Sequence, residues 1–160
     1  LLAPGLRLGY FTASPELMRR ALGFKLGSGP NQFAAVAIEG YLRNNLESHR
    51  DNFNPMLQAK CDSMTAALEQ HFGDSGATWS APEGGCYVWL TMPEGSDISS
   101  IRDKIFEQGV GYVAGTNFEA DASGRIGHNC ARLCFAFESV EKNAEGIALL
   151  AQLFKQHGAM

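Results

Sequence analysis

"CYVWLTM", residues 86–92, is the stretch of sequence that decides the fold. Apolar and aromatic residues of strand-forming type follow one another here without a break, which predicts a β-strand. Successive side chains of a strand point to opposite faces, so Tyr87, Trp89 and Thr91 share one face. The other face carries Cys86, Val88, Leu90 and Met92.

Helical and strand patterns alternate after this strand. Residues 96–109 predict a capped helix, residues 110–115 a second strand and residues 131–137 a third. Ser139 is the expected N-cap of a final helix. The apolar positions of the two helices are Ile98, Ile101, Ile105 and Phe106 in the first, predicted to be buried, and Val140, Ala144, Ile147, Ala151 and Phe154 in the second. The order of elements after residue 73 predicts an α/β or α+β sandwich in which helices pack on a small sheet.

The first 72 residues begin with a predicted strand and continue as helices. The strand is expected at residues 6–13, and a short helix follows it with Ser14 as N-cap and Pro15 at its first position. Residues 31–72 predict one long helical unit, which Pro55 interrupts or kinks. The later part of this unit carries an apolar stripe at helical spacing, formed by Leu57, Cys61, Met64, Leu68 and Phe72.

The composition is that of an ordinary globular chain. Of its 160 residues, 45% are hydrophobic and 19% are charged, and the formal net charge is −4. A nucleic-acid surface would require a basic balance with clustered lysine and arginine. No apolar run approaches the roughly 20 residues that cross a bilayer. We therefore expect neither nucleic acid nor a membrane as a partner of this segment.

Cysteine and histidine spacing gives no sign of a metal site. The four cysteines form no C-x-x-C pair. His128, Cys130 and Cys134 lie near one another in the sequence, but a tetrahedral zinc site needs four ligands, or three and an open position. We interpret the cysteines as small buried thiols in a reducing compartment and expect no metal.

No self-contained active site is evident from motifs. The sequence contains no G-x-S-x-G, H-E-x-x-H or Walker motif. Ser139 and Lys142 match S-x-x-K, but a helix is predicted to begin at this point. N-capping by Ser139 therefore explains the match better than a nucleophilic role.

Arg132 is the strongest candidate for ligand binding. Strand alternation gives it the small neighbours Cys134 and Ala136 on one face and assigns Leu133, Phe135 and Phe137 to the core face. The small neighbours leave room for a ligand, and a planar guanidinium binds a carboxylate or phosphate through two parallel hydrogen bonds. A structural salt bridge of Arg132 to Glu83 or Glu119 is an equally good interpretation.

Two further features bear on binding. Arg7 follows a Pro-Gly turn in an apolar neighbourhood, and because an unpaired buried charge is very costly, it needs an anionic partner. Gly84 and Gly85 precede the strand at residues 86–92, so the backbone there either adopts a positive φ or lies close to another group. A simple tight turn explains the two glycines equally well.

Four motifs occur together in the order LAPGLRLGY (2–10), PEGGCYVWL (82–90), GVGYVAGTNFEA (109–120) and ARLCFAF (131–137). Together they resemble the C-terminal half of the class I/II, fold type I aminotransferases that depend on pyridoxal 5′-phosphate (PLP). The branch that they resemble contains the 2-aminoadipate and kynurenine aminotransferases, with the aminotransferase-like domains of MocR-type regulators nearby. The resemblance spans essentially the whole chain.

The resemblance implies roles for individual residues. Arg7 matches the arginine that contacts the cofactor phosphate, and Arg132 matches the arginine that grips the substrate α-carboxylate. Gly84 and Gly85 match the turn that approaches the substrate during domain closure. The lysine that holds PLP as a Schiff base is expected immediately before Leu1, so no catalytic residue is expected within the chain. Many relatives have an arginine-rich RRD stretch where this chain reads LQAKCDSM (57–64).

The resemblance also implies a layout and an activity. Residues 1–30 would be a remnant of the PLP-binding large domain, residues 31–72 the interdomain helical segment and residues 73–160 the small domain. The full-length protein is expected to be a cytoplasmic homodimer that transfers an amino group between an amino acid and a 2-oxo acid, and this chain alone is expected to be inactive. An unpaired edge at residues 6–13 predicts self-association of the chain itself.

Two alternatives remain open at this point. The chain could be the effector-sensing part of a MocR-type transcriptional regulator, which an upstream winged-helix segment with a basic patch would favour. It could also be a free-standing interaction domain that has lost its cofactor site. Retention of both Arg7 and Arg132 argues against the interaction domain.

Overall fold

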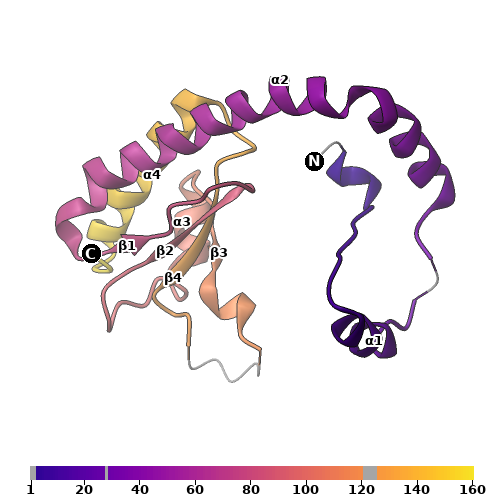
Figure 1. Ribbon diagram of the computed structural model, residues 1–160. Coiled ribbons are helices and arrows are strands. Elements are labelled where there is room, and N and C mark those ends of the chain that lie inside the picture. The colour runs from indigo at the N-terminus through magenta and orange to yellow at the C-terminus, as the bar shows by residue number, and fades with distance from the viewer. Residues whose placement is uncertain (1–2, 28, 121–125) are drawn as a thin grey trace. The chain divides into compact units, whose positions relative to one another are not determined.

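The computed structural model describes residues 3–27, 29–120 and 126–160. The chain divides into two compact units, Leu1–Asn52 and Phe53–Met160. The described strands all belong to the second unit (Figure 1), where helices pack on a small sheet. The fold class predicted from the sequence is therefore confirmed.

The first unit contains two short helical elements and the start of a long helix. A 3-10 turn, η1 (Pro4–Leu6), precedes α1 (Pro15–Gly23). The predicted cap of α1 is confirmed, because the Ser14 hydroxyl accepts a hydrogen bond from the Leu17 N–H at 3.4 Å. Pro15 occupies the first helical position, where its missing N–H costs nothing.

The predicted strand at residues 6–13 is wrong. Arg7 ends η1 in the left-handed region, with φ 54° and ψ 30°, a geometry that strands do not contain. The residues from 8 to 14 then follow without regular structure. A strand is stabilised by the hydrogen bonds of a neighbouring strand, and no strand in the described part of the chain pairs with this segment. The edge from which self-association was predicted is thus not formed by the described residues.

α2 (Gln32–Phe72) is a continuous helix of 41 residues that passes the boundary between the two units. Asn31 caps it, since its side-chain oxygen accepts a hydrogen bond from the Ala34 N–H at 3.2 Å. Pro55 removes one hydrogen bond but does not interrupt the helix, so the predicted long unit is confirmed. The apolar stripe that follows Pro55 is confirmed as well, with Leu57 partly buried and with buried side chains at Cys61, Met64, Leu68 and Phe72.

The sheet of the second unit has the strand order β1-β2-β4-β3, and every neighbouring pair is antiparallel. Its strands are β1 (Thr78–Trp79), β2 (Tyr87–Thr91), β3 (Val113–Ala114) and β4 (Cys130–Cys134). The helices α3 (Arg102–Glu107) and α4 (Val140–Gln156) pack with the last turns of α2 on one face of this sheet.

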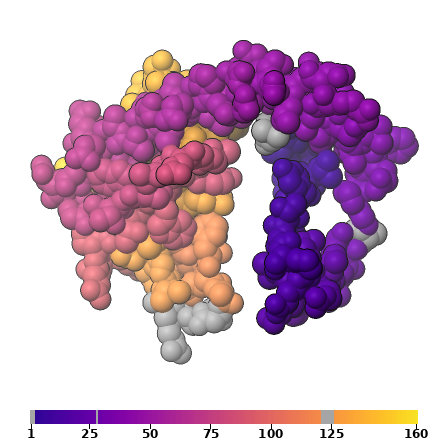
Figure 2. Space-filling model, in the orientation of Figure 1, coloured from indigo at the N-terminus to yellow at the C-terminus, as the bar shows by residue number. Residues whose placement is uncertain are grey.

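The hydrophobic core lies between this sheet face and the helices. In the space-filling view, the later part of α2 lies directly against the remainder of the second unit (Figure 2). Each fully buried large apolar side chain contributes about 1.5–3 kcal/mol relative to its exposed state. The largest of them are Phe72, Phe135, Phe154, Leu68, Leu90, Met92, Ile98, Ile105, Leu150, Leu153 and Val88.

Phe137 was predicted to be buried and is instead 86% exposed. β4 ends before this residue, because helix side chains take the backbone carbonyls that a longer strand would offer to a neighbour. Asn143 Nδ2 donates a hydrogen bond to Phe135 O at 2.9 Å, and Lys60 Nζ donates to Ala136 O at 2.8 Å. Beyond Cys134, the last residue of β4, these two carbonyls are thus bonded to helix side chains and not to a neighbouring strand.

Phe106 is a second wrong burial prediction, with 65% of its surface exposed. α3 is shorter than the predicted helix and turns by about 100° per residue. Ile105 takes the core position, so the adjacent Phe106 points elsewhere. The predicted strand at residues 110–115 is likewise shortened, to the two residues of β3.

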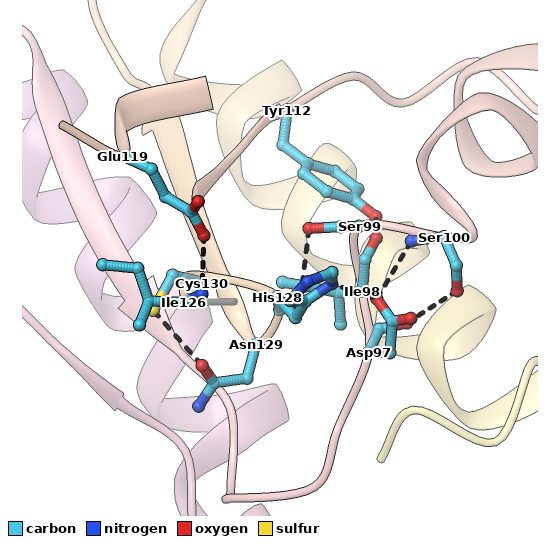
Figure 3. Close-up of polar contacts among 10 residues, drawn as sticks. All are labelled: Asp97, Ile98, Ser99, Ser100, Tyr112, Glu119, Ile126, His128, Asn129 and Cys130. Carbon is cyan, nitrogen blue, oxygen red and sulfur yellow. Dashed lines mark hydrogen bonds and ion pairs between the residues drawn. The ribbon is translucent and has the colours of Figure 1, made fainter. Parts of the chain in front are cut away.

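Hydrogen bonds fix the segment that leads into β4, and Figure 3 shows those in which side chains take part. The carbonyl of His128 accepts from the Ile98 N–H at 2.9 Å and from the Ser99 N–H at 3.1 Å. The carboxylate of Asp97 accepts from the Ser100 N–H at 3.1 Å, which holds the pKa of Asp97 below its ordinary value. The chain therefore enters β4 at a defined position.

Gly115 and Gly127 allow two backbone segments to approach closely. A Cβ atom at Gly115 would lie 2.5 Å from Gly127 O, and one at Gly127 would lie 2.6 Å from the carbonyl carbon of Gly115. Gly127 also has a φ of 77°, which favours glycine. Nearby, the Glu119 carboxylate accepts a hydrogen bond from the Ile126 N–H at 2.6 Å. These contacts fix η3 (Gly115–Phe118) against the segment before β4.

We expect Gly115→Ala to lower the free energy of unfolding by about 1–3 kcal/mol, because the added methyl group overlaps the backbone of Gly127. Urea unfolding followed by circular dichroism measures the change. Gly146→Ala is the matched control, since no atom lies within 4 Å of its added Cβ and it sits inside α4. The control should gain about 0.5–1 kcal/mol, and equal stabilities of the two variants would contradict the close approach.

Candidate functional site

Arg132 lies on the face of the sheet that the helices leave uncovered. In the antiparallel register it stands opposite Trp89 of β2 and Val113 of β3. Its neighbours along β4, Ala131 and Leu133, are buried in the core, so alternation directs Arg132 to the other face. The sequence-based assignment of its face is confirmed, and the residue is half-buried.

Two aromatic rings contact the Arg132 guanidinium. Its Cζ atom lies 4.1 Å from the centre of the Tyr87 ring and 5.0 Å from the centre of the Phe118 ring. Both distances fall within the range of cation–π interaction. The Trp89 ring meets Phe118 edge to face, with centroids 5.4 Å apart and planes at 74°. The cation is thus flanked by two aromatic rings.

The salt-bridge interpretation of Arg132 is not supported. None of the ion pairs and hydrogen bonds formed between described residues involves its guanidinium. The carboxylate of Glu119, one of the proposed partners, accepts a hydrogen bond from Ile126 instead. A guanidinium carries five N–H donors, and aromatic faces occupy none of them in a hydrogen bond. The arrangement is suited to an incoming carboxylate or phosphate.

The Gly84–Gly85 turn leads directly into the strand that carries Tyr87. Gly85 has a φ of 83°, so this position favours glycine, whereas Gly84 is exposed with no atom within 4 Å of an added Cβ. The turn lines a pocket of about 160 Å³ together with α2 residues and Phe135. The structure therefore places the turn and Arg132 in the same unit: the turn precedes β2, and β2 pairs with β4, which carries Arg132.

Arg7 belongs to the other unit and is exposed rather than buried in an apolar neighbourhood. One of its guanidinium nitrogens donates to Pro4 O at 3.3 Å. Its left-handed backbone is uncommon for a residue other than glycine. Such outliers gather at ligand sites, which makes Arg7 a candidate anion contact.

The cysteines are buried only in part. Burial raises the pKa of the Cys61 thiol, while Cys86 and Cys130 are half-buried. Cys134 is exposed, contrary to the prediction, because β4 turns it to the same open face as Arg132. Among residues 3–27, 29–120 and 126–160, no three His, Cys, Asp or Glu side chains are grouped as metal ligands would be.

The remaining motif is explained by capping. The Ser139 hydroxyl accepts a hydrogen bond from the Lys142 N–H at 3.2 Å, so the S-x-x-K match marks the start of α4. Within the described part of the chain, no helix combines the length and the apolar character that crossing a membrane requires.

Sequence reasoning did not assign the aromatic contacts of Arg132. The alternation of residues 86–92 already placed Tyr87 and Trp89 on one face, but the register with β4 was unknown. Phe118 comes from a 3-10 turn without a periodic pattern, so its place beside Arg132 depends on the approach of Gly115 to Gly127.

Comparison with known proteins identifies the class. The family model for aminotransferase class I and II matches residues 1–149, and the chain belongs to this family. It is 35% identical over 159 residues to aromatic-amino-acid aminotransferase 1 of Thermococcus litoralis, covering 98% of this chain and 37% of that protein. It resembles the solved kynurenine aminotransferase of Pyrococcus horikoshii with a TM-score of 0.79 and 31% identity, covering 98% of this chain and 38% of that one.

A regulator is also among the relatives. The HTH-type transcriptional regulator YdfD of Bacillus subtilis is 25% identical over 158 residues, which cover 97% of this chain and 32% of the regulator. In each of these comparisons the chain spans between about 32% and 38% of the relative's length.

We expect Arg132→Ala to change the free energy of unfolding by about 1 kcal/mol, which is the scale of a cation–π contact at a partly exposed site such as this one. Leu133→Ala is the matched control, because this adjacent residue faces the core and its truncation should cost about 2–5 kcal/mol. Chemical denaturation of both variants makes the comparison. A loss at Arg132 as large as that at Leu133 would identify a structural arginine.

Proposed function

We propose that this chain is the C-terminal part of a PLP-dependent aminotransferase, in which Arg132 binds the α-carboxylate of the amino acid and of the 2-oxo acid. The observation that carries the proposal is the Arg132 guanidinium, which lies on the open sheet face against two aromatic rings, without a carboxylate partner among the described residues. Membership of the aminotransferase family supports the reaction type.

Arg132 would act by orientation as well as by attraction. A guanidinium and a carboxylate form two parallel hydrogen bonds, which fix the plane of the carboxylate. Fixing this group also fixes the adjacent Cα atom, whose proton must be removed in the reaction. Holding a reacting bond in the productive direction lowers the entropic part of the barrier.

The residues of this chain fit one part of the cofactor. Arg7 presents an exposed guanidinium that donates to the backbone carbonyl of Pro4, and an exposed guanidinium suits a phosphate group. PLP, when bound, supplies an electron sink for the reaction at Cα. The lysine that attaches it is proposed to precede Leu1. Among the lysines of this chain, Lys60 donates to Ala136 O and Lys142 pairs with Glu138 at 3.4 Å, so neither is proposed for that role.

The proposed layout assigns residues 1–30 to the large domain, 31–72 to the interdomain helix and 73–160 to the small domain. Gly84 and Gly85 would approach the substrate when the small domain closes over it. The surroundings of Gly84 support this approach: no atom lies within 4 Å of an added Cβ, so neighbouring groups of the chain do not explain the glycine. Closure of this kind excludes water from the reacting groups.

Two further properties belong to the proposal. The full-length protein would be a homodimer. This part of the proposal rests on family membership alone, because the edge strand predicted at residues 6–13 is not formed. It would be cytoplasmic, which the four free cysteines support, since thiols stay reduced in that compartment. This chain alone would be inactive.

A regulatory role is the second candidate. The relative YdfD supports it, because an HTH-type regulator matches nearly the whole of this chain. In a regulator Arg132 would bind an amino-acid effector without turnover. Repeated conversion of an amino acid to its 2-oxo acid by the full-length protein distinguishes an aminotransferase from such a sensor.

In the full-length protein, we expect Arg132→Ala to lower kcat/KM for the amino acid by about 10²–10³-fold, because each charge-assisted hydrogen bond contributes about 1.5–3 kcal/mol. Arg132→Lys should recover part of the loss, since it keeps the charge but not the planar fork. Steady-state kinetics measures both. PLP affinity, followed by absorbance titration, should stay within about twofold.

Arg102→Ala is the control for this comparison, because that arginine pairs with Asp103 at 2.8 Å on α3 and lies outside the proposed site. Its kinetics should match those of the unchanged protein. Unaltered kcat/KM in Arg132→Ala would defeat the carboxylate assignment.

A further inference from the structure

We propose that Tyr87 and Phe118 are positioning residues, which hold the Arg132 guanidinium ready for a carboxylate while leaving its charge and its N–H donors available. This inference rests on the proposed function of Arg132. It adds two residues to the site, from two different elements. Both would act through Arg132 and not by contact with the reacting atoms.

The first ring is placed by the register of the sheet. Tyr87 pairs with Cys134, and Trp89 pairs with Arg132, so Tyr87 is the diagonal cross-strand neighbour of Arg132 on the same face. Diagonal neighbours in an antiparallel pair are within reach of aromatic and other long side chains. The distance of 4.1 Å from the Arg132 Cζ atom to the Tyr87 ring centre follows from this placement.

The second ring is placed by the turn after β3. Phe118 ends η3, which the close approach of Gly115 and Gly127 fixes against the segment before β4. The Phe118 ring also meets the Trp89 ring edge to face, and this contact restricts its position further. The Phe118 ring lies 5.0 Å from the Arg132 Cζ atom, at the end of the turn that these backbone contacts hold.

Aromatic rings hold a cation in a way that suits a binding site. A carboxylate partner would take up the N–H donors that the substrate needs, and it would neutralise the charge that attracts the substrate. A ring face attracts the cation through its quadrupole and leaves the donors at the edge of the guanidinium free. A guanidinium held in one orientation also loses less conformational entropy when the carboxylate binds.

Both rings are themselves half-exposed, at 46% each, so they are not needed to fill the core. Their exposure distinguishes both rings from the buried aromatic residues of the unit, such as Phe72 and Phe154. Their removal should therefore affect the state of Arg132 more than the stability of the fold.

The test uses the full-length protein with Tyr87→Leu, Phe118→Leu and Tyr87→Phe. We expect each leucine variant to raise KM for the amino acid about 5- to 10-fold with kcat within about twofold, as loss of a partly desolvated cation–π contact predicts. Tyr87→Phe should restore KM to within about twofold, because it keeps the ring face. Phe106→Leu is the matched control, since this exposed ring of α3 is not in contact with Arg132. It should leave KM unchanged.

A double-mutant cycle separates action through Arg132 from direct contact with substrate. In the Arg132→Ala background, Tyr87→Leu should have no further effect on KM, because the group that it positions is gone. A full 5- to 10-fold effect in that background would overturn the proposal. So would a leucine variant whose KM equals that of the Phe106→Leu control.

The outcomes also separate this inference from the proposed function. If Arg132→Ala leaves kcat/KM unchanged, the carboxylate assignment itself fails. If Arg132→Ala is impaired but both leucine variants keep the original KM, only the positioning role fails. Urea unfolding of each variant confirms that a kinetic change does not arise from loss of the fold.

Discussion

The antiparallel pairing of β2 with β4 is the interaction on which the rest of the structure depends. Its register sets Leu90 opposite Ala131 on the core face and Trp89 opposite Arg132 on the open face. Because side chains alternate with a period of two, a shift of one residue would send the cation toward the core and expose Leu133. The same ladder of hydrogen bonds therefore specifies both the packing of the core and the composition of the candidate site.

The helix α2 is tied to the chain that leaves β4. Lys60 donates to Ala136 O at 2.8 Å, and Ser63 donates to Val140 O at 2.6 Å. Both donors lie in the stretch LQAKCDSM at residues 57–64. The strand that carries Arg132 and the later turns of α2 thus belong to one packed body, in which the open face of the sheet keeps its place relative to the core.

The sequence predicted those features that depend on local pattern and left open those that depend on tertiary contact. The caps at Ser14 and Ser139 and the faces of β2 were predictable, because hydrogen-bonding side chains and a period of two act over a few residues. The strand at residues 6–13 failed because a strand also needs a neighbour. Phe137 failed because side chains distant in sequence, Lys60 among them, end β4 early. The aromatic contacts of Arg132 needed the strand register and the contact between two glycines, neither of which is written in a local pattern.

A bound substrate is expected to adopt a specific geometry at Arg132. The most direct measurement is an experimental structure of the full-length protein with an amino-acid substrate or its 2-oxo acid. We expect both carboxylate oxygens to accept hydrogen bonds from Arg132 at about 2.7–2.9 Å, with its guanidinium still against Tyr87 and Phe118. A substrate carboxylate bound by other groups, with Arg132 out of hydrogen-bonding reach, would contradict the account.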